Sequence, residues 1–393
     1  CSEVNMLDTL TLAKELINIE SVTPRDNGCQ QLIASYLKDL HFDVTHLPSQ
    51  NVNNIWAQWG KTGPLFAFSG HTDTVPAGPL RQWRFPPFSA TEHENQLYGR
   101  GAADMKSAIG AMMCAIHEFL DETTDIVFKI GMMITSDEEG DAVHGTTKII
   151  EFLEKNHIKL QWCLIGEASS VNELGDSIKI GRRGSLHGEL QLSGKQGHIA
   201  YPQLADNPIH RCFKALDALT QTEWDQGNEY FSPTSFQIYH IHADTGASNL
   251  IPGCLSTKFN FRFSPESNAE SLQQRVCNTL DAHELDYAIR WNLSSEPFLS
   301  QSGALLQACN DAIESICQIQ PHPNTAGGTS DGRFITRTGC ELVELGPLNA
   351  SIHQINEHIS ISDLYQLKDI YKAVLNEINN HIKKTGDNRC NIG

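Results

Sequence analysis

The sequence lacks the features that mark several large classes of protein. None of its 11 cysteines belongs to a CxxC pair, and an odd, unpatterned set is typical of reduced thiols in a cytoplasm. No apolar run approaches the roughly 20 residues that a membrane-spanning helix needs. The chain also has no internal repeat and no low-complexity linker. We therefore expect a cytoplasmic protein that neither spans a membrane nor depends on disulfides.

Positive charge is also scarce. The chain has 29 Lys and Arg residues against 47 Asp and Glu residues, so its formal net charge is −18. Such acidity argues against nucleic acid or an anionic membrane as the main partner. Cys1–Asp8 has no basic stretch followed by an apolar core, so we expect no signal peptide. Cys1 in place of Met suggests a processed terminus, and the polar tail Lys383–Gly393 is expected to fray.

The length and the patterning of the chain predict two domains. With 393 residues, the chain is too long for one ordinary core. Up to residue 182 and again from residue 297, short apolar runs alternate with helix-like stretches, which favours a largely parallel sheet flanked by helices. Residues 183–296 instead show the alternating pattern of half-exposed strands. We therefore predict an α/β domain over 1–182 and 297–393, with an inserted α+β domain over 183–296.

Hydrophobic periodicity locates the individual elements. We expect Trp83–Gln96 to be a loop, because it combines prolines with aromatic residues. Helices are expected at Leu7–Ile19, Cys29–Leu40, Ser107–Leu120, Thr146–Asn156, Asn207–Thr220, Ala269–Asp281, Gly303–Gln318 and Ser362–Ile382. Strands are expected at Phe42–Leu47, Asn54–Trp59, Leu65–Ser69, Ile126–Thr135, Trp162–Ile165, Ile178–Ile180, Ser185–Leu192, Ser235–His242, Leu255–Phe263 and Glu341–Leu345.

Residues able to bind metal follow the ends of three expected strands. His71 follows the first, Glu138 and Glu139 follow the second, and Glu167 follows the third. In α/β sheets, working residues gather where strands end and loops open. Asp73 lies two residues beyond His71, where its carboxylate could accept the second ring N–H and fix the tautomer of the histidine.

With Asp104 and His353, these residues form a candidate metal site. Nitrogen and oxygen ligands suit zinc, and two neighbouring metals need a shared bridge, for which Asp104 is the natural carboxylate. Each residue also has an ordinary interpretation. His71 could be a hydrogen-bonded turn residue, the acidic run at Glu138 a solvated loop, and Glu167 a helix cap. The residues alone leave both interpretations open.

Eight motifs in register carry a resemblance to a known family. In order, they read HTDTVPAG, YGRGAADMK, SDEEG, GEAS, GRRGSL, GHIAYP, GGTSDGR and LGPLNASIH. Over nearly the whole chain, from about Leu7 to about Ile382, the sequence resembles the two-zinc aminoacyl hydrolase family. The resemblance implies a catalytic zinc-binding domain, a dimerisation (lid) domain formed by the insert, and two zinc ions per subunit that Co²⁺ could replace.

The resemblance also implies roles for the metal-binding candidates. Glu138 would be the general base, and Asp73 would be a further catalytic residue. The first zinc would be held by His71 and Glu167, the second by Glu139 and His353, and both by Asp104.

A homodimer and a small-molecule substrate are further implications of the resemblance. His198 would donate a hydrogen bond to the oxyanion in the partner's active site, although the residue alone is also typical of a turn histidine. A substrate with several carboxylates requires local cations. The substrate-binding candidates are Arg182, Ser185, Tyr201, Asn249, Arg262, Gly328, Thr329 and Asn349, whose ordinary interpretation is surface arginines and turn formers.

The predicted activity is hydrolysis of an amide bond in a small N-acylated amino acid. Other deacylases of the same family, such as acetylornithine deacetylase or an aminoacylase, are alternatives that a substrate panel distinguishes. A non-catalytic binding protein on the same fold is another, and loss of Glu138 or of a metal ligand would indicate it. A mononuclear zinc peptidase is a third, which Asp104 as a bridge disfavours.

Overall fold

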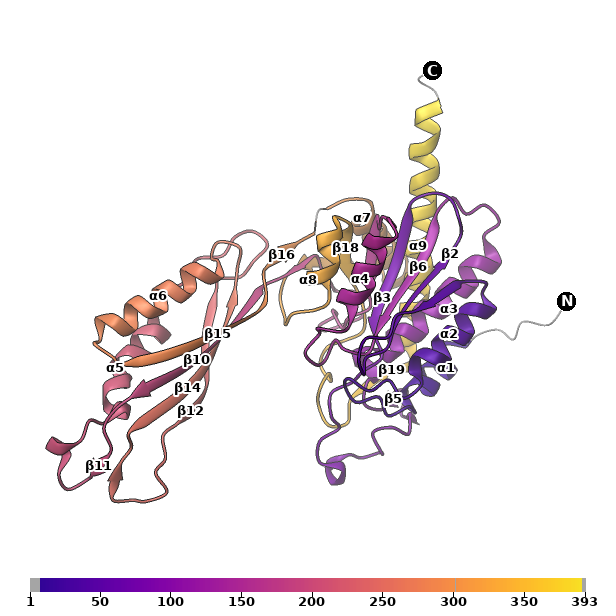
Figure 1. The fold of residues 1–393 in the computed structure, drawn as a ribbon. Helices are drawn as coiled ribbons and strands as arrows, with labels where there is room; N and C mark the ends of the chain where they lie inside the picture. Colours follow the sequence, from indigo (N-terminus) through magenta and orange to yellow (C-terminus); the bar gives the residue numbers. More distant parts are fainter. Residues whose placement is uncertain (1–7, 301, 391–393) are drawn as a thin grey trace. The chain divides into compact units, whose positions relative to one another are not determined.

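A computed structural model describes residues 8–300 and 302–390 (Figure 1). The chain forms two compact units. The α/β unit comprises Cys1–Ile180, Ser300–Asn324 and Ser330–Gly393, and the α+β unit comprises Gly181–Leu299 and Thr325–Thr329. The predicted boundaries had left this last short segment in the first domain. The catalytic and dimerisation roles of the two domains remain predictions.

A mixed eight-stranded sheet lies at the centre of the α/β unit. Its central strands pair in parallel, and antiparallel pairings occur on either side of them. This arrangement confirms the predicted fold class. In their order across the sheet, the strands are β1 (Asp43–His46), β2 (Asn54–Trp59), β6 (Lys129–Thr135), β3 (Leu65–His71), β7 (Trp162–Ile165), β18 (Glu341–Glu344), β8 (Ser177–Lys179) and β17 (His322–Asn324).

The parallel register brings three strand ends to one edge of this sheet. All seven residues of β3 are buried, as its apolar composition predicts. His71, the last residue of β3, lies opposite Thr135, the last residue of β6. Ser69 of β3 lies opposite Ile165, the last residue of β7. The loops that follow β3, β6 and β7 therefore start side by side.

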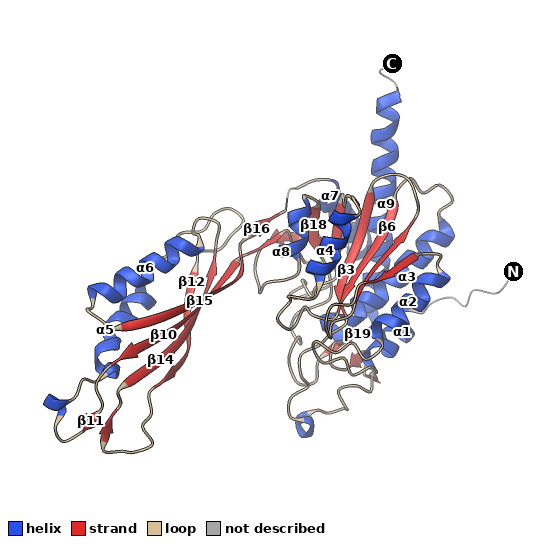
Figure 2. Ribbon diagram, viewed as in Figure 1, coloured by secondary structure: helices blue, strands red, loops and turns tan. Residues whose placement is uncertain are grey.

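Helices cover both faces of this sheet (Figure 2). One group packs with the strands into a large apolar core, whereas α4 (Thr146–Lys155) contacts β2, β6 and α8 (Gly332–Ile335). Part of the tail that we expected to fray, residues 383–390, continues α9 (Ile361–Cys390), and residues 391–393 lie outside the described residues. Each further residue of an existing helix adds one hydrogen bond, so a packed helix extends past its apolar face. The core group is α1 (Thr9–Ile17), α2 (Cys29–Asp39), α3 (Ser107–Glu122), α7 (Ala304–Cys317) and α9 (Ile361–Cys390), and the others are α4 (Thr146–Lys155) and α8 (Gly332–Ile335).

The expected loop Trp83–Gln96 contains a strand, so this prediction was wrong. Strand β4 (Thr91–His93) pairs with β5 (Gln96–Tyr98), which pairs with β19 (His358–Ser360). The connecting residues Glu94 and Asn95 both have positive φ, 50° and 61°. Such two-residue turns are usually marked by Asn-Gly, and the Glu-Asn pair here lacks that signal.

The α+β unit is built on a four-stranded antiparallel sheet with two helices. Gly188 leaves room for the Phe259 ring on the neighbouring strand, because a Cβ there would lie 2.3 Å from it. Asn207 caps α5 as predicted, accepting a hydrogen bond from the Ile209 N–H at 3.0 Å. Strand β15 (Tyr287–Ser295) was not predicted from the sequence. The strands, in order, are β12 (Ser235–His242), β14 (Cys254–Phe263), β10 (Gly184–Ser193) and β15 (Tyr287–Ser295), and the helices are α5 (Pro208–Gln221) and α6 (Ala269–Ala282).

Several short elements complete the two units. In the α+β unit, β11 pairs with β13 and β9 pairs with β16. Over the described ranges, no helix combines the length and apolarity needed to cross a bilayer. The short elements are β9 (Gly181–Arg182), β11 (Gly197–His198), β13 (Leu250–Ile251), β16 (Phe298–Leu299), η1 (Leu80–Gln82), η2 (Ala102–Lys106), η3 (Pro202–Leu204) and η4 (Thr336–Thr338).

Tyr371 provides a test of how α9 is fixed to the sheet. Its side chain is fully buried, and its hydroxyl donates to the Leu345 carbonyl at 2.6 Å. Tyr371→Phe removes the donor from a buried carbonyl, so the free energy of unfolding should fall by about 1–2 kcal/mol. Tyr365→Phe on the same helix is the control, since its hydroxyl contacts Asp8 at the surface. That change should cost less than about 0.5 kcal/mol. Equal losses in urea denaturation would contradict this view.

Candidate metal centre

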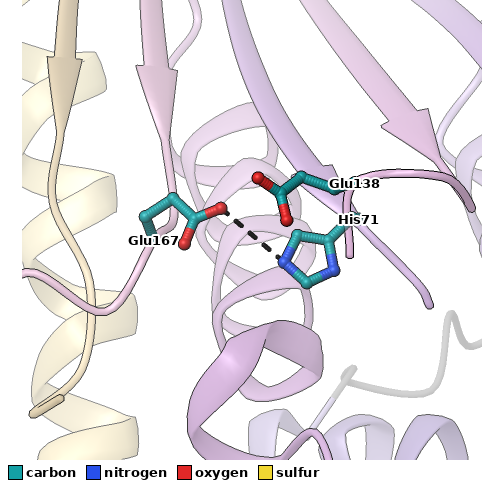
Figure 3. A group of neighbouring side chains, drawn as sticks. All are labelled: His71, Glu138 and Glu167. Atoms are coloured by element: carbon teal, nitrogen blue, oxygen red, sulfur yellow. Dashed lines mark ion pairs between the residues drawn. The ribbon is translucent and has the colours of Figure 1, made fainter. Parts of the chain in front are cut away.

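Three strand ends direct a histidine and two glutamates at one point (Figure 3). His71 closes β3, while Glu138 and Glu167 lie in the loops after β6 and β7. One ligand atom from each of the three residues lies within 4.8 Å of the others. The ring Nε2 of His71 is 3.6 Å from Oε1 of Glu167. These are three of the residues that the sequence marked as candidates.

Asp104 joins this group to a second one. Its Oδ1 is 3.1 Å from Nε2 of His71, and its Oδ2 is 3.2 Å from Nε2 of His353. The same nitrogen of His353 is 2.9 Å from Oε1 of Glu139. His71, Asp104 and Glu139 also place one ligand atom each within 4.8 Å of one another. The two oxygens of Asp104 thus face different histidines, an arrangement that a bridging carboxylate requires.

Asp73 orients the site differently from our expectation. Nδ1 of His71 is 2.9 Å from the backbone carbonyl oxygen of Asp73 and 3.6 Å from its carboxylate. The carbonyl, not the carboxylate, therefore accepts the ring N–H and leaves Nε2 turned toward Asp104. The Asp73 carboxylate instead accepts from the backbone N–H groups of Glu138, at 3.2 Å, and Glu139, at 3.1 Å. It thereby ties the loop after β6 to the loop after β3.

The electrostatics of the cluster favour added positive charge. Burial and the neighbouring Glu167 carboxylate raise the pKa of Glu138 well above its ordinary value. Burial alone would lower the pKa of His71, but Asp104 and Glu167 raise it well above the usual range. Hydrogen bonds with Asp104 and Glu139 raise the pKa of His353 to about 10. The carboxylates thus favour positive charge at the two histidines, and a bound cation would compete with protons for their ring nitrogens.

The donor set fits a divalent metal. It combines imidazole nitrogen with carboxylate oxygen and contains no thiolate, which suits zinc and similar ions. His71 and Asp104 are buried, whereas the side chain of His353 is 48% exposed. The site is therefore anchored in the protein and open to solvent on the side of His353.

The predicted substrate-binding residues fall into separate groups. In the α+β unit, Ser185 lies opposite Arg262 in the pairing of β10 with β14. Nη1 of Arg182 donates to the Ala326 carbonyl at 3.1 Å, so the GRRGSL motif meets the segment that contains Gly328 and Thr329. The GRRGSL and GGTSDGR motifs, which are far apart in sequence, therefore lie together.

A second group lies around β11 in the same unit. The rings of His198 and Tyr201 have centroids 5.6 Å apart, and the Ile199 N–H donates to the Asn249 carbonyl at 2.9 Å. Asn349 instead belongs to the α/β unit, where its N–H donates to the Ser170 carbonyl at 2.9 Å. The substrate-binding roles of all these residues remain predictions.

Sequence reasoning missed several buried charged residues, and three of them, Asp331, Arg100 and Glu357, make contacts that bear on this part of the fold. Asp331 accepts from the Thr146 hydroxyl at 2.6 Å, and burial raises its pKa to about 6. Arg100 and Glu357 form an ion pair at 2.6 Å. Asp331 and Arg100 lie inside quoted motifs, and Glu357 lies four residues after one. The motifs were therefore the only signal for these residues, but a motif does not distinguish a buried charge from a solvated one.

Comparison with known proteins gives consistent matches. The model of Peptidase family M20/M25/M40 matches residues 67–377. A relative from Coxiella burnetii (strain RSA 493 / Nine Mile phase I) is 53% identical over 94% of this chain and 99% of its own. A relative from Thioalkalivibrio sulfidiphilus (strain HL-EbGR7) is 53% identical over 95% of this chain and 99% of its own. Both are succinyl-diaminopimelate desuccinylases.

Solved structures share the fold at low identity. An M20 family metallo-carboxypeptidase, Sso-CP2 from Sulfolobus solfataricus, has a TM-score of 0.82 at 17% identity, covering 95% of this chain and 99% of that one. The YXEP protein of Bacillus subtilis, a dinuclear metal binding peptidase from the M20 family, has a TM-score of 0.71 at 14% identity, covering 94% and 97%. The predicted family resemblance is confirmed: this protein belongs to Peptidase family M20/M25/M40, and it is a metal-dependent amide hydrolase.

Proposed function

We propose that the protein hydrolyses N-succinyl-LL-2,6-diaminopimelate to succinate and LL-2,6-diaminopimelate, a step of lysine and diaminopimelate biosynthesis in the cytoplasm. The observation that carries this proposal is 53% identity with relatives of that name over 94% of the chain. Every residue that the resemblance assigns to metal binding or proton transfer is also present and clustered. This completeness disfavours a non-catalytic binding protein.

Two zinc ions per subunit are part of the proposal. His71 and Glu167 would hold one, Glu139 and His353 the other, and Asp104 would bridge them. The arrangement of the Asp104 oxygens, each 3.1–3.2 Å from a different histidine, supports this assignment. When bound, zinc lowers the pKa of a coordinated water and polarises a substrate carbonyl. Co²⁺ is proposed as a functional substitute.

Glu138 is the proposed general base. It belongs to the group with His71 and Glu167, whereas its neighbour Glu139 belongs to the group with Asp104. One of the two adjacent glutamates can therefore bind metal while the other accepts a proton from the attacking water. A carboxylate oxygen of Glu138 takes a proton from the attacking water and later gives it to the leaving amine.

Substrate recognition and dimerisation are proposed for the α+β unit. Arg182 and Arg262 would bind substrate carboxylates, with the other substrate-binding candidates as hydrogen-bonding partners. Exposed apolar side chains on edge strand β12 (Tyr239 and Ile241) and on α5 (Phe213) support a self-complementary homodimer interface.

His198 is the proposed donor to the oxyanion of the partner subunit. Its Nδ1 accepts from the Ala200 N–H at 3.1 Å, so the ring proton of the neutral side chain lies on Nε2. The residue is exposed, so this donor is accessible to a second subunit. Donation to a developing oxyanion is typically the largest electrostatic contribution in acyl transfer.

A metal and substrate assay tests the proposed reaction. The zinc-loaded enzyme should release succinate from N-succinyl-diaminopimelate, and a chelator should abolish turnover because no protein group replaces the metal. Metal analysis should give two ions per chain. N-acetylornithine and N-acetyl amino acids are the comparison substrates, and faster turnover of either would contradict the proposed specificity. A single ion in excess zinc would contradict the proposed number of metals.

Glu138→Gln tests the general base. An amide cannot accept the water proton, so turnover should fall by about 10²–10⁴-fold while both metals remain bound. Glu139→Gln is the matched control, since it should lower the metal content itself. Near wild-type turnover by the Glu138 variant, with its metals confirmed by elemental analysis, would refute the assignment.

His198→Ala tests the contribution from the partner subunit. The variant should bind zinc and dimerise normally, yet lose about 10²–10³ in rate. His381→Ala, which changes an exposed histidine of α9, should have no effect. Mixed dimers of the His198 and Glu138 variants contain one site with both residues intact, so activity should partly return. If chain exchange is demonstrated and the mixture stays inactive, His198 does not act across subunits.

A further inference from the structure

A buried ion pair lies behind the candidate metal centre. Nη1 of Arg100 is 2.6 Å from Oε2 of Glu357, and the two side chains are only 3% and 1% exposed. Glu357 lies four residues after His353 and Arg100 lies four residues before Asp104. Neither residue belongs to the candidate metal ligands. A buried pair of this kind costs desolvation, so the contacts that it makes require an explanation.

The Glu357 carboxylate holds the backbone of the loop that carries Asp104. Its Oε1 accepts from the N–H groups of Ala103, at 2.9 Å, and Asp104, at 3.0 Å. Its Oε2 accepts from the N–H of Gly101 at 3.1 Å, in addition to Arg100. One carboxylate therefore fixes three backbone amides within four consecutive residues, including the amide of Asp104 itself.

The backbone of this loop is also restrained by its close packing and by a buried lysine. Gly101 has a φ of +84°, and a Cβ at this position would lie 2.7 Å from Cγ2 of Thr74. On the other side of the loop, Nζ of the buried Lys106 donates to the carbonyls of Leu16, at 2.9 Å, and Ile19, at 2.6 Å. Glu357 and Lys106 thus anchor the two ends of the segment that presents the Asp104 carboxylate.

Arg100 extends the same network to the segment that follows His353. It donates to the carbonyls of Gln354, at 3.2 Å, and Pro76, at 3.3 Å. Its charge also offsets the repulsion between the carboxylates of Glu357 and Asp104, which would otherwise oppose each other in a buried environment. The network therefore connects the loop that carries Asp104 to the segment that carries His353 through hydrogen bonds.

We propose that Glu357 is a positioning residue for the metal centre, which acts by fixing the backbone of Asp104 so that its two carboxylate oxygens face the two metal sites. The inference rests on the proposed two-metal function. It adds to that function a residue that touches neither metal nor substrate. Because Asp104 is the only ligand proposed for both sites, a displacement of its loop weakens both sites together.

Glu357→Gln gives this proposal a distinctive signature. Both carboxylate oxygens of Glu357 accept from N–H groups, so in either orientation the amide NH₂ of the variant would face a backbone donor and the loop would shift. The dissociation constants of both zinc ions should rise by about 10–100-fold, the usual effect of losing an outer contact of a metal ligand. His353→Ala, which removes a ligand proposed for one site, should weaken one ion far more than the other.

Zinc titration of the metal-free, full-length protein by calorimetry measures these constants without any substrate. Asp225→Asn is the matched control. Asp225 also accepts from backbone amides, those of Gly227 at 3.0 Å and Thr234 at 2.9 Å. It lies in the α+β unit, which contains no candidate metal ligand, so its loss should lower stability and leave both zinc constants unchanged.

Glu357→Asp guards against a variant that fails to fold. It retains the charge but is one methylene shorter, so it should reach fewer donors and fall between wild type and Glu357→Gln at both sites. Unchanged zinc constants in a folded Glu357 variant, or weakening of one ion alone, would overturn the proposal. Succinate release by the wild-type enzyme is scored separately, so failure of the proposed reaction is distinguishable from failure of this inference.

Discussion

The parallel pairing of β3 with β6 and β7 is the constraint on which the rest of the structure depends. Parallel neighbours present their carboxyl ends at the same edge, so the pairing of the backbones is enough to bring the residues after each strand close together. The strands themselves are apolar and buried, which fixes their register independently of the polar loops. The metal centre is therefore a consequence of how the core packs.

Five carboxylates at one edge of a sheet, those of Asp73, Asp104, Glu138, Glu139 and Glu167, carry an electrostatic cost that the surrounding groups reduce. Asp73 accepts two backbone amides from the loop with the paired glutamates, and Asp104 is placed between two histidines. The remaining excess of negative charge raises the pKa values of these histidines. Bound cations would neutralise this excess negative charge, so the charge that opposes folding of the metal-free site also favours metal binding.

The sequence predicted the parts of this structure that depend on local pattern. The apolar runs located β3, β6 and β7, and the residues directly after them included the candidate ligands, because a strand end is a local feature. The contacts of Asp73 and Glu357 could not be predicted from the sequence, because they depend on which backbone atom faces each side chain in the folded protein. The hairpin of β4 and β5 was missed because its turn has no glycine. The extension of α9 was missed because polar residues continue a helix without any apolar signal.

The position of β18 within the large sheet has a consequence for the order in which this protein folds during synthesis. This strand lies between β7 and β8, although more than a hundred residues separate them from it in the chain. A nascent chain therefore leaves the ribosome with its α/β sheet divided and with apolar strand edges unpaired, while the α+β unit has already been completed. Closing such long loops is slow, and exposed edges invite misassembly. Chaperone dependence and aggregation during expression are thus expected to arise from the interval between synthesis of β8 and synthesis of β18.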